Sequence, residues 1–237
     1  MSENQPPSYQ ATDNKQPLIF INKVKMRMWR HSLLLALGIF CFFFIYVFIY
    51  NNFSFSPKLI FPPVIAATAA LMIGLSYAMS SLCYYFNFLD SKIAYRKYWG
   101  LTGYWLAVLY SLLLAFIFPD RYIFGFIKNF WTADILLGIT AMTILTFMAV
   151  ISQDWVMREM GAQRWRQALR FGYLASFLFV IRAYILEKDL WFTWLTGGGN
   201  LPPPRLLISI FTLVVIGLRA SLEGSKLLHS QLFFKKE

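Results

Sequence analysis

The chain has 237 residues, of which 58% are hydrophobic and 14% charged, and its mean hydropathy is +0.54. A soluble domain with this balance would expose large apolar patches and aggregate, so the composition excludes a soluble globular protein. The net charge of +11 would indicate nucleic-acid binding in a soluble protein. Here, however, the Lys and Arg residues flank long apolar runs. Basic residues are enriched at such places in membrane proteins, on the cytoplasmic side of the bilayer. We therefore expect contact with membrane lipids and no nucleic-acid partner.

Six stretches are long and apolar enough to cross a bilayer as helices, which takes about 20 residues each. Continuous apolar runs favour helices over barrel strands, which would be shorter and alternating. The sequence thus predicts an all-α integral membrane bundle of six transmembrane helices. The expected spans are residues 32–51, 60–83, 101–119, 134–152, 171–191 and 205–222.

Two polar segments flank the predicted bundle, which occupies residues 31–222. Residues 1–30 are polar and contain Pro6, Pro7 and Pro17, so we expect a partly disordered tail. Residues 223–237 form a short basic tail. The first apolar run starts late and no small-residue cleavage site follows it, which is typical of a signal anchor that stays in place.

The basic residues predict the orientation of the bundle. With the N-terminus inside, sixteen of the 22 Lys and Arg residues lie on the cytoplasmic side, five lie outside, and Arg182 falls within a span. The positive-inside rule therefore places both termini in the cytoplasm.

Small residues mark two of the predicted helices as packing surfaces. Ala70, Gly74 and Ala78 recur at four-residue intervals on the second span, and Gly172 with Ser176 forms a shorter stripe on the fifth. Such stripes let neighbouring helices approach closely.

Arg182 is the only full charge in the middle of a predicted span. A buried charge is costly and marks a pathway, a partner or a bound anion, unless it reaches an acidic side chain. Glu187, Asp189 and Asp134 are the candidates within reach. For Asp134 itself, at the start of the fourth span, we expect a helix-capping role.

The two histidines lie near the cytoplasmic ends of predicted helices. His31 is at the mouth of the first span and His229 is in the C-terminal tail, so neither lies at mid-membrane depth. Haem b between helices needs facing His pairs. We interpret both as interfacial polar residues, with a redox ligand role as the alternative. No nucleophile elbow, HExxH or paired-carboxylate motif is present, so we do not expect an enzyme.

Three stretches resemble the ferric reductase-like transmembrane family, which includes the haem-binding membrane subunit of the bacterial methionine sulfoxide reductase system. They are YRKYWGLTGYWLAVLYSLL at 95–113, ILLGITAMTILTFMAVISQDW at 135–155 and GAQRWRQALRFGYLASFLFVIRAYI at 161–185. The resemblance implies a six-helix subunit of the bacterial inner membrane with haem between its third and fifth helices.

The resemblance also implies that the haem ligands have been replaced. It places Tyr110, Leu169 and Arg182 where the family has His. Neither an aliphatic chain nor a permanent cation binds iron, and a lone Tyr is an uncommon haem ligand. The sequence has no GxGxxG motif, which a nicotinamide-binding domain would need, so we do not expect such a domain in this sequence.

Three functions remain open at this point. The leading hypothesis is a haem-free, degenerate family member with a scaffold or accessory role, bound to a membrane or peripheral protein partner and needing no cofactor. The alternative is an electron-transfer subunit that uses haem b or a quinone. A small transporter ranks last. The residues for an anion or partner contact are Arg182, Arg164, Arg166 and Arg170.

Overall fold

The structure is a computed structural model that describes residues 18–86, 92–198 and 201–234. Helices are its only regular elements within these ranges. Six are long: α1 (Leu18–Tyr50), α2 (Pro57–Tyr85), α3 (Tyr95–Ile117), α5 (Ala133–Ile151), α7 (Phe171–Leu195) and α8 (Pro204–Phe234). Three are short: the π-helix η2 (Asp120–Phe124), α4 (Phe126–Asn129) and α6 (Asp154–Ala168).

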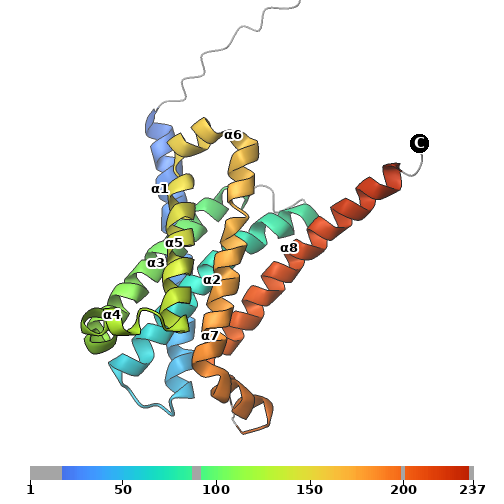
Figure 1. The fold of residues 1–237 in the computed structure, drawn as a ribbon. Helices are drawn as coiled ribbons and strands as arrows, with labels where there is room; N and C mark the ends of the chain where they lie inside the picture. Colours follow the sequence, from blue (N-terminus) through green and yellow to red (C-terminus); the bar gives the residue numbers. More distant parts are fainter. Residues whose placement is uncertain (1–17, 87–91, 199–200, 235–237) are drawn as a thin grey trace, which may run out of the picture.

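The long helices pack side by side as one bundle with two distinct ends (Figure 1). The start of α1, the helix α6 and the end of α8 lie toward one end, which we name the α6 end. The α1–α2 connection, α4, the end of α7 and the start of α8 lie toward the other, which we name the α4 end. Successive long helices therefore alternate in direction.

Five helices are long and apolar enough to cross a membrane: α1, α2, α3, α5 and α8. They contain five of the six expected spans, so the chain is an all-α, polytopic membrane protein. The helix α7 does not meet the same measure, because every 18-residue stretch of it holds at least three charged residues.

Two helices run beyond the predicted spans into the segments expected to be tails. α1 begins at Leu18 and α8 continues to Phe234, so residues 18–30 and 223–234 are helical. No proline interrupts either stretch, and helices extend where nothing breaks them. The rest of the predicted tails, residues 1–17 and 235–237, lies outside the described residues.

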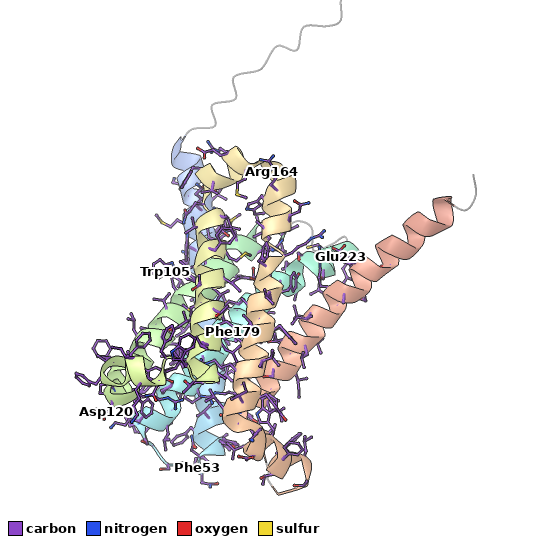
Figure 2. The ribbon with its side chains drawn as sticks, viewed as in Figure 1. Phe53, Trp105, Asp120, Arg164, Phe179 and Glu223 are labelled. Carbon is purple, nitrogen blue, oxygen red and sulfur yellow. The ribbon has the colours of Figure 1, made fainter. Side chains whose placement is uncertain are left out.

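Large apolar side chains cover the outer surface of the bundle. Leu37 and Phe42 of α1, Trp105 of α3 and Phe177 of α7 are all exposed. Figure 2 shows Trp105 on the outside, whereas Phe179 packs against the core. This apolar surface is suited to contact with lipid, because a protein that exposed it to water would aggregate.

Glycines allow the close helix contacts that the small-residue stripes predict. Gly74 of α2 lies against the ring of Phe211 from α8, and Gly172 of α7 lies against the phenol of Tyr77 from α2. A β-carbon at either position would collide with the ring. The stripes on the second and fifth predicted spans are therefore confirmed as contact surfaces.

Gly161 and Trp165 shape α6. Both belong to the stretch 161–185 of the sequence. Gly161 has φ +74°, a left-handed conformation that glycine adopts without strain, and it divides α6 into two short helices. The indole N–H of Trp165 then donates to the carbonyl oxygen of Ile151 at 3.1 Å. This bond holds α6 back against the end of α5.

Candidate functional site

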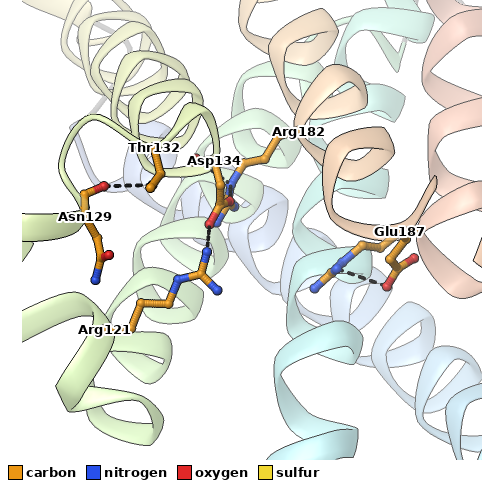
Figure 3. A network of polar contacts seen from close by, with 7 residues as sticks. Arg121, Asn129, Thr132, Asp134, Arg182 and Glu187 are labelled. Carbon is orange, nitrogen blue, oxygen red and sulfur yellow. Dashed lines mark hydrogen bonds and ion pairs between the residues drawn. The ribbon is translucent and has the colours of Figure 1, made fainter. Parts of the chain in front are cut away.

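A buried carboxylate at the α4 end joins two arginines from different elements. Asp134 lies in the first turn of α5 and is 5% exposed. Its Oδ1 accepts a hydrogen bond from Nε of Arg182 at 2.7 Å, and its Oδ2 accepts one from a terminal nitrogen of Arg121 at 2.7 Å (Figure 3). The network links α5 to α7 and to the connection that follows α3.

The backbone of α5 is shaped to admit the guanidinium of Arg182. Nε also donates to the backbone oxygen of Asp134 at 3.1 Å. Gly138 lies one turn further along α5, and a β-carbon there would be 3.3 Å from the same Nε. A larger residue at 138 would therefore displace the arginine.

The two arginines differ in their contact with solvent. The side chain of Arg182 is 12% exposed, whereas that of Arg121 is 48% exposed. The buried part of this network thus holds one positive and one negative charge, and the half-exposed Arg121 adds a further positive charge. Burying a charge is tolerable when it is paired and hydrogen-bonded in this way.

Of the three acidic candidates for Arg182, the structure selects Asp134. Glu187 pairs instead with Arg205 of α8 at 3.0 Å, and Asp189 is exposed. The expected capping role of Asp134 is wrong: the N-cap of α5 is Thr132, and no side chain caps the helix. Because the carboxylate is bonded to two arginines, it does not turn back to the free N–H groups.

An outer cavity of about 100 Å³ lies beside this network. Arg182 and Tyr110 both line it, with Arg205, Ser176 and Thr212. Ligand sites for cofactor-sized molecules measure roughly 300–1,000 Å³, whereas a water in the liquid takes about 30 Å³. Tyr110 and Arg182 therefore share a space that fits a few waters.

An inner cavity of about 550 Å³ lies nearer the α6 end. Leu169 lines it and also belongs to the apolar core, with 8% of its surface exposed. Other lining residues are Tyr77, Arg96, Lys97, Tyr104 and Trp165. Leu169 and Arg182 thus lie at two depths, one at each cavity, and Ile73 of α2 lines both.

The other predicted arginines are not brought to Arg182. Arg164 is exposed on α6, and Arg170 reaches Glu223 of α8 at 3.5 Å. Arg166 lies in α6, but its side chain is outside the described part of the chain.

The two histidines lie on α1 and α8. His31 is exposed, and its Nδ1 is 2.7 Å from the backbone oxygen of Arg27 in the preceding turn of α1. Its ring also meets that of Tyr95 edge-on. His229 is in the last turns of α8, and its side chain is outside the described residues.

A second charged cluster, at the α6 end, was missed by the sequence reasoning. Asp154 accepts hydrogen bonds from Lys97 at 2.7 Å and from Lys25 at 2.9 Å, so it joins α6 to α3 and α1. The hydrogen bond from Lys97, and after it the one from Lys25, lowers the pKa of the Asp154 carboxyl to about 2. No local pattern announces this cluster, because its members are 57 and 129 residues from Asp154.

Within the described ranges, no three His, Cys, Asp or Glu side chains gather as a metal site would require. No protein-family model matches the sequence, and no curated protein shows significant similarity to it.

Proposed function

We propose that this chain is a six-helix membrane protein, with both termini in the cytoplasm, that acts as a structural or accessory subunit of a membrane complex. The observation that carries the proposal is the pairing of Arg182 with Asp134. At the place where the resembled family has a metal-binding imidazole, this chain has a cation that is already bonded to a neighbouring helix. The position therefore serves helix packing in our proposal.

The same network supports α7 as the sixth span. By composition alone, α7 holds too many charged residues for a membrane span. Two of these residues, Arg182 and Glu187, are paired inside the bundle. Pairing removes most of the cost of placing a charge in hydrocarbon. α7 also packs against α5 on one side and α8 on the other.

Cysteine labelling tests the number of spans and the orientation. With Cys41 and Cys83 replaced by Ala, single cysteines are introduced as Ser54→Cys, Arg158→Cys and Thr196→Cys. A membrane-impermeant maleimide should label positions 54 and 196 in intact cells and position 158 only after lysis. Protection of position 196 would mean that α7 does not cross.

We further propose that the chain is a degenerate member of the ferric reductase-like family, in a bacterial inner membrane, and that it works without haem. A leucine in the core and an ion-paired arginine offer no lone pair to iron. Absorbance of the protein purified from haem-supplied cells should lack a Soret band. A b-type reduced spectrum would overturn the haem-free assignment while leaving the six-span topology intact.

An electron-transfer subunit with haem b or a quinone is the second candidate. The inner cavity favours it, because about 550 Å³ is within the range of cofactor sites. A redox titration separates the two candidates: a subunit without a cofactor shows no midpoint potential. A transporter has less support, because Arg182 is paired with Asp134 and leaves no free intramembrane charge at that position.

A further inference from the structure

An arginine on α3, Arg96, lines the inner cavity, and no carboxylate of the described residues pairs with it. Arg96 lies in the first turn of the helix. Its backbone is fixed, because the hydroxyl of Ser76 donates to its carbonyl oxygen at 2.7 Å. A partly buried guanidinium without a carboxylate partner among the described residues calls for an anion.

The surrounding charges do not supply that anion. Asp154 also lines the cavity, but Lys97 and Lys25 share its carboxylate. Arg219 lies within electrostatic range of Arg96 and is itself paired with Glu223. Lys97, Asp154 and Arg96 together leave the cavity lining with one excess positive charge.

The lining of the cavity combines charged and apolar side chains. Arg96 and Lys97 belong to the first turn of a membrane-crossing helix, which is the depth of lipid headgroups. The rings of Trp29 and Tyr98 meet edge-on at this end of the bundle, as interfacial aromatic side chains do. Other lining residues are apolar: Ile73, Leu101, Leu145, Met148 and Leu169.

We propose that the inner cavity binds an acidic phospholipid, with its phosphate group on the guanidinium of Arg96. The apolar side chains of the lining would receive the beginning of an acyl chain. A volume of about 550 Å³ suits a headgroup with part of a chain. Basic pockets between transmembrane helices are known to hold anionic headgroups, and arginine binds phosphate through two parallel hydrogen bonds. This site is independent of the accessory role proposed above.

Native mass spectrometry of the delipidated full chain tests the site. The protein is mixed with phosphatidylglycerol or with phosphatidylcholine of the same acyl chains, and the bound fraction is measured. We expect the wild type to prefer phosphatidylglycerol and Arg96→Gln to bind it about tenfold more weakly, because a charge-assisted bond is lost. Arg30→Gln is the matched control, since Arg30 is an exposed arginine on α1 that does not line the cavity.

Two further variants keep the test decisive if Arg96→Gln does not fold. Arg96→Lys keeps the charge and should retain part of the preference. Ala149→Phe keeps Arg96 but fills the cavity that Ala149 lines, so it should weaken lipid binding.

Equal binding of phosphatidylglycerol by the wild type and Arg96→Gln would overturn the site. An inorganic-phosphate arm tests the lipid assignment. Phosphate that raises the melting temperature as much as the lipid, in both wild type and Ala149→Phe, would point to a free anion and overturn the assignment.

Discussion

Arg182 of α7 and Asp134 of α5 are 48 residues apart in the chain, and yet the Nε of the arginine lies 2.7 Å from Oδ1 of the aspartate. Both side chains are buried in the bundle. Two long helices are thereby tied at a fixed depth and rotation. The pair also carries the structural role that we propose for this chain, so its energetics bear on that proposal.

Removing the central carboxylate should destabilise the bundle far more than removing its exposed partner. Asp134→Asn leaves the buried Arg182 uncompensated, which costs about 3–5 kcal/mol in buried pairs. Arg121→Gln removes a half-exposed charge, and the expected loss is below about 1 kcal/mol. The free energy of unfolding in mixed micelles measures both. Equal losses would contradict the assignment of Asp134 and Arg182 as the interior pair.

Neutralising both members of the pair should recover part of that loss. The double variant Asp134→Asn with Arg182→Gln buries two amides and no net charge, so it should be more stable than Asp134→Asn alone. Coupling energies for residues in contact are about 0.5–3 kcal/mol. A double-mutant cycle on the unfolding free energy gives this value. Strict additivity would mean that the two side chains do not interact.

Gly172 and Gly38 offer a matched comparison of helical glycines. Gly172→Ala places a methyl group against the phenol of Tyr77, and we expect a loss of about 1–3 kcal/mol from overpacking. Nothing lies within 4 Å of a β-carbon at Gly38, so Gly38→Ala should be neutral or stabilising by about 0.5–1 kcal/mol. Thermal unfolding of the two purified variants provides the measurement. A tolerated Gly172→Ala would show that α2 and α7 do not approach closely there.

The Asp154 cluster should make stability depend on acidic pH. The pKa of Asp154 falls from an ordinary 3.8 to about 2 in the folded protein, so its contribution is present above about pH 4 and is lost as the pH falls through 2. The carboxylate is 43% exposed, so the effect should be small and weaken with salt. Melting temperatures between pH 5 and pH 2 should fall less for Asp154→Asn than for the wild type. Parallel curves would contradict the link to Lys25 and Lys97.

The sequence by itself determined the fold class and most of the helices. Hydrocarbon demands about 20 apolar residues with every backbone hydrogen bond satisfied inside the segment, so composition and run length locate spans directly. Five of the six expected spans lie on helices that can cross a membrane. The sequence also predicted the contact surfaces at Gly74 and Gly172, because small residues repeated at helical spacing can be recognised within a single helix.

Only the tertiary structure decided which charges meet and where cavities remain. Sequence reasoning placed Asp134, Glu187 and Asp189 all within reach of Arg182, and helix rotation selected Asp134 while Glu187 went to Arg205. It gave no sign that Arg96 would line a large cavity in which none of the described carboxylates pairs with it. Such relations depend on how whole helices turn and tilt against one another, and a local pattern along a single helix carries no information about that.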